Sequence, residues 1–261
     1  MVRQDTRAPF EGALGRAREA AFAPGEYVGQ ESFMRAPEIR ALAGRAGIGP
    51  GVSVLDLCCG VAGPGRLITR ELGCAYLGVD ASAGAIEVAT ALARGLPCRF
   101  EAAAVPPLPA GSFDVVLLLE TMLAFRDKEA LVRGVAGALA PGGRFAFTLE
   151  EGRPLTGAER VRMPDADTVW LTPLAEMREL LAGAGLTVAW QEDCTRSHRA
   201  VAASLLEAYA ADGPSIAAAI GRRALDDLLT AHRLWVEWLS TGRARKFTLV
   251  ARSGSDPERR P

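Results

Sequence analysis

Several features are scarce in this chain, and each scarcity narrows what the protein can be. Of 261 residues only two are histidine, and the five cysteines lack the spacing of a metal-binding cluster. The formal net charge is −1, whereas nucleic-acid-binding proteins usually carry a basic patch. No apolar stretch is long enough to cross a bilayer, and the first residues lack the apolar core of a secretory signal. We therefore expect no metal, nucleic-acid or membrane partner.

The composition that remains is typical of a cytoplasmic enzyme with one sizeable core. Hydrophobic residues make up 49% of the chain, which at this length favours one α/β domain over two. The odd number of cysteines indicates reduced thiols that pack as small hydrophobic groups. The chain shows no internal repeats. We expect a monomer or a homodimer that acts on a small molecule.

Short apolar runs alternate with helical segments through the middle of the chain. Strands are expected at 52–57, 75–79, 98–101, 114–119 and 144–150. Helices are expected at 31–46, 65–72, 82–93 and 128–139. Such alternation with short connections predicts a parallel, doubly wound sheet.

The most informative segment is residues 52–65, which read VSVLDLCCGVAGPG. An apolar strand ends near Asp56, a loop of small residues follows, and a helix begins at about residue 65. The loop lets a ligand approach the backbone, and the helix N-terminus offers free N–H groups to an anion. A second apolar run ends at Asp80, about 20 residues after the loop, where an acid suits a ribose diol. The unit is predicted to bind a nucleoside.

The glycine pattern indicates which nucleoside. Residues 60–65 read G-x-x-G-x-G, unlike the G-x-G-x-x-G of dinucleotide-binding proteins, and Asp56 precedes them. The segment resembles motif I, D-x-G-x-G-x-G, of the class I S-adenosylmethionine (SAM)-dependent methyltransferases, with Cys58 and Ala62 where glycine is common. Other segments resemble this family in the expected order: AYLGVD at 75–80, PLPAGSFDVV at 107–116, PGG at 141–143 and LAGAGL at 181–186. The resemblance covers about residues 30–190.

The resemblance implies a Rossmann-like sheet of seven strands with an antiparallel last strand and a helical cap. It also implies SAM as cofactor and S-adenosylhomocysteine as product. Asp80 would bind both ribose hydroxyls, and the backbone of Ala102 and Ala103 would lie at the adenine. Tyr27 would either face the sulfonium or anchor the N-terminal arm. The full set of expected cofactor residues is Tyr27, Asp56, Cys58, Gly60, Asp80, Ala81, Ala102, Ala103 and Glu120.

Domain boundaries follow from the same resemblance. We expect an arm at 1–29, a single SAM-binding domain at 30–252 and a tail at 253–261. Strands at 186–191 and 246–252 would be antiparallel neighbours. The irregular segment 151–172 and the helical segment 195–240, broken once at 212–214, would form the cap over the active site.

Side chains from the cap and from the segment after strand four are the expected substrate residues. They are Phe33, Met122, Phe125, Trp170, His198, Tyr209 and Trp235. His198 is the candidate general base because imidazole titrates near neutrality, and the alternative is a surface histidine. His232, in the middle of a helix, is a weaker candidate. For Met122 and Phe125 the alternative is core packing.

The expected reaction is methyl transfer to a small, partly apolar metabolite, and a loose resemblance of the cap to bacterial natural-product methyltransferases favours secondary metabolism. SN2 attack on the sulfonium by oxygen, nitrogen or carbon needs alignment and water exclusion more than acid–base groups. Three alternatives stay open: a SAM-assisted cyclase or isomerase, an NAD-binding oxidoreductase and a non-catalytic binding module.

Overall fold

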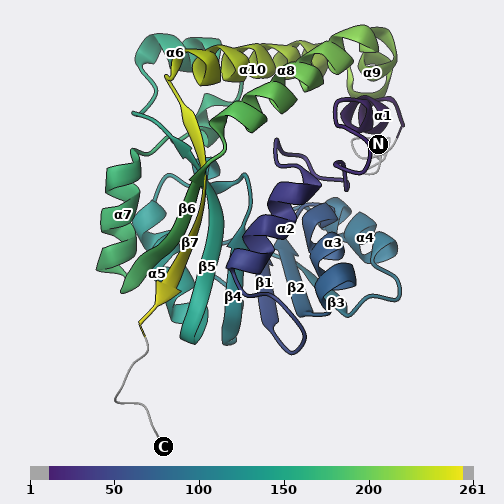
Figure 1. The fold of residues 1–261 in the computed structure, drawn as a ribbon. Helices are drawn as coiled ribbons and strands as arrows, with labels where there is room; N and C mark the ends of the chain where they lie inside the picture. Colours follow the sequence, from purple (N-terminus) through teal and green to yellow (C-terminus); the bar gives the residue numbers. More distant parts are fainter. Residues whose placement is uncertain (1–11, 255–261) are drawn as a thin grey trace, which may run out of the picture.

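The computed structural model describes residues 12–254, and seven strands there form one sheet in the order β3-β2-β1-β4-β5-β7-β6 (Figure 1). The strands are β1 Ser53–Leu57, β2 Ala75–Asp80, β3 Cys98–Ala102, β4 Phe113–Leu118, β5 Leu139–Glu151, β6 Leu186–Asp193 and β7 Arg245–Ser253. β7 is antiparallel to both of its neighbours, and the remaining pairs are parallel. The predicted doubly wound sheet with an antiparallel last strand is confirmed.

Helices cover both faces of the sheet and extend beyond its edge (Figure 1). They are α1 Gly12–Ala20, α2 Ala36–Arg45, α3 Gly63–Leu72, α4 Ala83–Leu92, α5 Lys128–Ala138, α6 Gly157–Arg162, α7 Leu174–Gly183, α8 Thr195–Ala211, α9 Gly213–Ile220 and α10 Arg222–Thr241. α2, α3 and α4 pack on one face, and α5 and α7 on the other. Within the described residues no helix has the length and apolarity to span a membrane.

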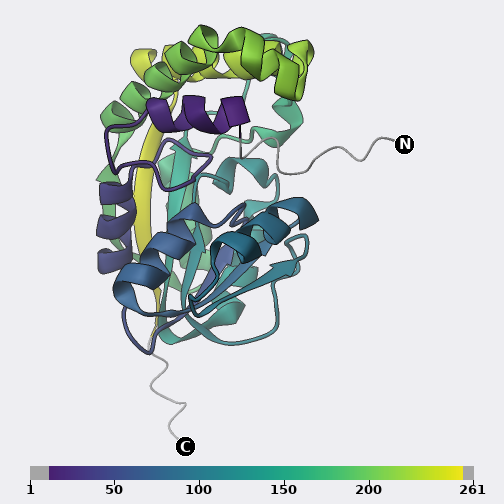
Figure 2. The ribbon, with the colours of Figure 1, turned by 90° about the vertical axis from the view of Figure 1, so that its right-hand side faces the viewer.

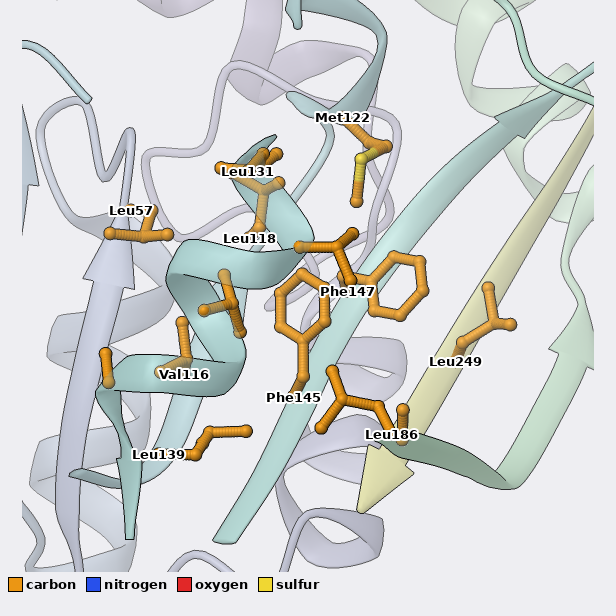
Figure 3. Packing of buried hydrophobic residues seen from close by; sticks show 14 of the residues in the cluster. Leu57, Val116, Leu118, Met122, Leu131, Leu139, Phe145, Phe147, Leu186 and Leu249 are labelled. Carbon is orange, nitrogen blue, oxygen red and sulfur yellow. The ribbon is translucent and has the colours of Figure 1, made fainter. Parts of the chain in front are cut away.

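The central strands are apolar on both sides because both faces are covered. Phe145 and Phe147 of β5 stack with ring centroids 4.4 Å apart, and Leu118 and Leu249 pack in the same cluster (Figure 3). Each fully buried side chain of this size contributes roughly 1.5–3 kcal/mol relative to an exposed one. This core fixes the carboxyl ends of the parallel strands, where the functional site lies.

A cap made of α1, α8, α9 and α10 lies beyond the carboxyl ends of the parallel strands (Figures 1 and 2). It has an apolar cluster of its own, in which Tyr209, Trp235 and Trp238 are at least nine-tenths buried. The helical segment breaks at Asp212 as predicted and again at Gly221, whose φ is +92°. The segment 151–172, expected to be irregular, contains α6. Thr156 caps the N-terminus of this helix, because its side chain accepts a hydrogen bond from the backbone N–H of Glu159.

Candidate active site

A cavity of about 230 Å³ lies at the carboxyl ends of β1, β2 and β4. Its walls come from four segments of the chain: the loop after β1, the end of β2, the residues after β4 and the N-terminal segment that precedes α2. The lining residues are Gly29, Gln30, Glu31, Ser32, Asp56, Cys58, Cys59, Gly60, Val61, Gly63, Pro64, Asp80, Leu119, Glu120 and Thr121. In a doubly wound sheet this edge is where ligands bind.

The loop between β1 and α3 turns through left-handed backbone at every second residue. Cys58, Gly60 and Ala62 have φ of 56°, 54° and 54°. Cys58 and Ala62 therefore adopt the left-handed conformation that favours glycine, which for other residues costs roughly 1–2 kcal/mol. The loop persists because its surroundings hold it: the backbone N–H of Gly60 donates to Asp80 Oδ2 at 2.9 Å.

Two glycines at the start of α3 are required by close packing. A Cβ on Gly63 would lie 2.5 Å from the carbonyl oxygen of Val28, because the N-terminal segment crosses the helix there. A Cβ on Gly65 would lie 2.2 Å from the ring of Tyr76. The absence of these side chains lets the N-terminal segment close the cavity and lets the Tyr76 ring pass beneath the loop.

Asp56 forms the buried floor of the cavity and is 3% exposed. The Tyr76 hydroxyl donates to its Oδ2 at 2.6 Å. Burial raises the pKa of Asp56 to about 7, a shift that the Tyr76 hydrogen bond opposes. A cation bound beside this carboxyl would stabilise its ionised form.

Asp80 stands half-buried at the end of β2. Its Oδ1 accepts from the backbone N–H of Ser82 at 2.8 Å, and its Oδ2 accepts from Gly60. Each carboxylate oxygen has a second lone pair, so Asp80 is still able to accept two further hydrogen bonds. The geometry suits a diol at the rim of the cavity.

A buried ionic network adjoins the cavity. Lys246 of β7 is 3% exposed, and its Nζ lies 2.8 Å from Glu120 Oε2 and 2.6 Å from Glu150 Oε1. Burial disfavours the ammonium, but the two carboxylates outweigh burial and raise the pKa of Lys246. Burial likewise acts to raise the pKa of Glu120, and Lys246 and His198 reverse this into a lowering. Glu120 Oε1 is fully enclosed and has no hydrogen-bond partner in the described part of the chain.

His198 packs against Glu120 but does not itself line the cavity. Its imidazole is 0% exposed, with Nδ1 3.5 Å from Glu120 Oε1 and Nε2 3.7 Å from Glu38 Oε2. Burial lowers the pKa of His198, partly offset by Glu120. The alternative of a surface histidine is wrong, and so is the expectation that this side chain faces the substrate pocket, because packing between two carboxylates encloses it.

A second cavity, also of about 230 Å³, lies under the cap. It shares Gln30, Glu31 and Ser32 with the first, so one short segment separates the two spaces. Its other lining residues are Arg18, Phe22, Phe33, Leu205, Tyr209, Leu228 and His232. Of the residues expected at the substrate, the structure places Phe33 and Tyr209 here, together with the less favoured His232.

The other expected substrate residues lie elsewhere. Met122 is 0% exposed in the core beneath the sheet, and Phe125 packs on the same cluster, so the core-packing alternative holds for both. Trp170 lies at the surface between the guanidinium groups of Arg126 and Arg160, at 5.1 and 4.9 Å. The expectation that Met122, Phe125 and Trp170 contact the substrate is therefore wrong. Met122 and Phe125 pack against apolar side chains of the core, and Trp170 packs against two guanidinium groups. Trp235 packs inside the cap, 5.5 Å from Trp238.

Five expected cofactor residues line the first cavity: Asp56, Cys58, Gly60, Asp80 and Glu120. Ala81, Ala102 and Ala103 are exposed beside its rim, and the backbone N–H of Ala103 donates to the carbonyl of Asp80 at 2.9 Å. Tyr27 lies against Phe22, with ring centroids 5.5 Å apart. The roles assigned to these residues stay predictions.

Sequence reasoning overlooked Lys246, Glu150 and the lining residues Gln30 and Thr121. Lys246 left one usable signal, because it falls within a strand predicted to be buried and a buried lysine requires a partner. Its partners follow only from the sheet, since Glu150 and Lys246 face each other across the antiparallel pairing of β5 and β7.

Comparison with known proteins supports the geometry. A methyltransferase-domain family model matches residues 54–143. Methyltransferase GfsG of Streptomyces halstedii is 35% identical over 109 residues, which are 40% of this chain and 39% of that protein. The chain thus matches about two fifths of the length of this curated relative.

Two solved structures share the fold over almost the whole chain. The mycolic acid cyclopropane synthase CmaA1, complexed with S-adenosylhomocysteine (SAH) and CTAB, has a TM-score of 0.79 at 12% identity and covers 97% of this chain and 99% of its own. The [4+2]-cyclase SpnF has a TM-score of 0.74 at 21% identity, covering 96% and 93%. At these identities the likeness establishes the fold alone. With the matched family domain and the motif that begins at Asp56, SAM is the cofactor, and residues 54–143 form a methyltransferase domain of the class I SAM-dependent type.

Proposed function

We propose that the first cavity holds SAM and that the chain transfers the methyl group to a small, partly apolar acceptor bound under the cap. The observation that carries this proposal is the adjacency of the two cavities, which meet at Gln30, Glu31 and Ser32. One cavity has the acids and turns that suit a nucleoside with an amino-acid end, and the other has aromatic walls.

The residues of the first cavity fit the parts of SAM. Asp80 has lone pairs for the ribose hydroxyls, and the free N–H groups at the start of α3 suit the carboxylate. Asp56, on the cavity floor, is the acceptor for the ammonium. When bound, SAM supplies a methyl group attached to a positively charged sulfur.

The chain's own task is then to align the acceptor and exclude water. The N-terminal segment is fastened over the site: the Phe33 N–H donates to Glu120 Oε2 at 3.2 Å, and Gln30 Nε2 donates to the Met34 carbonyl at 2.8 Å. The cap encloses the space behind it. This arrangement supports an apolar metabolite as acceptor, and we extend the proposal to secondary metabolism on the cap's resemblance to natural-product enzymes.

Replacement of Asp80 tests the cofactor site. Asp80→Ala removes the acceptor for the ribose and releases the Gly60 N–H, so we expect SAH to bind at least about tenfold more weakly, which is about 1.4 kcal/mol. Isothermal titration calorimetry with SAH measures this. Asp226→Ala, an exposed acid on α10, is the matched control and should leave the affinity unchanged. An unchanged dissociation constant for Asp80→Ala contradicts the assignment.

A SAM-assisted cyclase on the same fold is the second candidate, since a cyclase is among the fold neighbours. The mass of the product separates the two reactions. Methyl transfer adds one CH2 unit to the acceptor and yields SAH, whereas cyclisation or isomerisation leaves the acceptor mass unchanged. An acceptor screen read by mass spectrometry decides between them.

A further inference from the structure

The cavity under the cap contains one group with unused chemistry. His232 of α10 is half-buried in its wall, between the ring of Tyr209 at 5.0 Å and the ring of Phe33 at 5.8 Å, both edge-on. The two rings hold the imidazole in one plane. Leu205, Leu228 and Phe22 add apolar lining, and Arg18, Gln30, Glu31 and Ser32 supply the polar part.

The hydrogen bond that His232 makes fixes its tautomer. Its Nδ1 lies 2.8 Å from the carbonyl oxygen of Leu228, and a carbonyl only accepts, so Nδ1 carries the proton. In the neutral ring Nε2 then holds a lone pair. Nε2 has no hydrogen-bond partner among residues 12–254 and is not one of the fully enclosed atoms. A basic nitrogen of a residue that lines the cavity is thus left without a hydrogen bond in the described part of the chain.

The charges around this nitrogen keep it neutral. Burial lowers the pKa of His232; the Leu228 carbonyl opposes this, and Arg18 lowers the pKa further. Arg18 forms an ion pair with Glu31 and interacts with the Tyr209 hydroxyl. The two charged residues of the lining therefore compensate each other, and the cavity suits an uncharged molecule.

We propose that this cavity binds an uncharged hydroxylated acceptor with an aromatic-sized apolar body, and that His232 Nε2 accepts its proton. The proposal rests on the proposed function and names its substrate class. The volume is sufficient, because a cavity of about 150 Å³ already holds benzene. The two aromatic walls favour a flat ring.

The step balances without a further reactant. As the acceptor oxygen forms its bond to the methyl carbon, the carbon–sulfur bond breaks and its electron pair stays on sulfur. The hydroxyl proton passes to Nε2, which leaves a neutral ether, a neutral thioether and an imidazolium. The positive charge of the sulfonium thus ends on His232, which releases the proton to water before the next turnover.

His198 serves as the internal control for this assignment. The chain has two histidines, and His198 is enclosed between two carboxylates and is not a lining residue of either cavity. A molecule in the cap cavity should therefore affect one imidazole and leave the other unchanged.

Nitrogen-15 NMR of the imidazole rings tests the proposal on the intact chain. Long-range proton–nitrogen spectra of the labelled protein with SAH bound should show two rings, assigned with His198→Gln and His232→Phe. We expect the His232 ring to carry its proton on Nδ1 at neutral pH. A ring protonated on Nε2, or on both nitrogens at neutral pH, overturns the proposal.

Phenol and toluene form a matched pair of probes, since they differ only by a hydroxyl in place of a methyl group. Phenol should shift the Nε2 resonance of His232, whereas toluene should shift nearby methyl signals and leave Nε2 in place. The His198 resonances should not move with either probe. A phenol titration to its solubility limit that leaves Nε2 unmoved overturns the proposal.

His232→Phe keeps an aromatic ring against Tyr209 and Phe33 and removes both nitrogens. For a hydroxylated acceptor that the wild type methylates, we expect kcat to fall by about 10²-fold or more and the acidic limb of the pH–rate profile to disappear. SAH affinity, measured by calorimetry, should stay unchanged. If the wild type does not bind SAH, the proposed function itself is contradicted. If SAH binds but the pH–rate profile of His232→Phe is the same as that of the wild type, only the role of His232 is contradicted.

Discussion

The carboxyl group of Asp56 couples the protonation of the cavity floor to folding. Its pKa in the folded chain is about 7, above its ordinary value of 3.8, so the folded state binds a proton more tightly than the unfolded state. The contribution of Asp56 to stability is then fully present below about pH 4 and is lost as the pH rises through 7. An ionised Asp56 without a bound cation is the unfavourable state.

Asp56→Asn tests this linkage. The amide keeps an oxygen for the Tyr76 hydroxyl and has no titration, so the free energy of unfolding of the variant should rise relative to the wild type as the pH rises from 5 to 8. Urea denaturation of both proteins without ligand, at four pH values, measures the difference. A difference that is constant with pH shows that the folded pKa is not raised.

Lys246 neutralises two carboxylates that are otherwise buried. Lys246→Met keeps the aliphatic chain and leaves Glu120 and Glu150 without a counter-charge, so we expect a loss of about 3–5 kcal/mol in the free energy of unfolding. Arg133→Ala breaks an exposed ion pair with Glu129 and should cost less than about 1 kcal/mol. Chemical denaturation measures both, and similar costs would show that the buried network is not stabilised by charge pairing.

Single residues also mark the limit of prediction from sequence. Asp56, Gly60 and Asp80 were expected at the site because each belongs to a local motif, and local spacing survives folding. The partners of Lys246 are distant in sequence, and His232 became accessible through the way the cap helices pack. Neither the pairing of Lys246 with its carboxylates nor the position of His232 in a cavity wall produces a pattern in the sequence.

The junction between the N-terminal segment and α3 is the element on which closure of the cofactor cavity depends. Gly63→Ala would place a Cβ 2.5 Å from the Val28 carbonyl and 2.7 Å from the carbonyl carbon of Gly29, both backbone atoms that cannot rotate away. We expect lower stability and weaker SAH binding, measured by thermal melting and calorimetry. Gly137→Ala, exposed on α5 with nothing within 4 Å of the new Cβ, should instead stabilise by roughly 0.5–1 kcal/mol. Equal effects of the two substitutions would refute the crossing.

Most strands and helices of the sheet were predictable to within a few residues, although α2 begins at Ala36 rather than 31 and β5 at Leu139 rather than 144. In the cap, the helical segment and its break at Asp212 were predicted, whereas its further division was not. Strands buried on both faces leave apolar runs bounded by turns, and the helices between them leave amphipathic periods. In the cap, the break at Gly221 was missed because a lone glycine is also tolerated inside a helix. The short α6 and the contribution of α1 to the cap cluster depend on tertiary contacts.

Across the whole molecule, the N-terminal segment 28–33 links the sheet, the cofactor cavity and the cap. It crosses α3, its Phe33 N–H donates to Glu120, and its residues 30–32 line both cavities. A ligand in the first cavity should therefore order the floor of the second. This coupling requires no movement of the sheet.

Hydrogen–deuterium exchange with and without SAH tests this coupling. We expect protection to rise in residues 28–33 and in the loop 58–64, while the core of β5 stays as slow as before. At SAH concentrations of about 100 times the dissociation constant, the free energy of unfolding should also rise by about 2.7 kcal/mol. Asp80→Ala at the same SAH concentration is the control and should show smaller protection in both segments. If protection rises only in the loop and not in residues 28–33, the segment closes the cavity but does not respond to ligand binding, and the proposed coupling is contradicted.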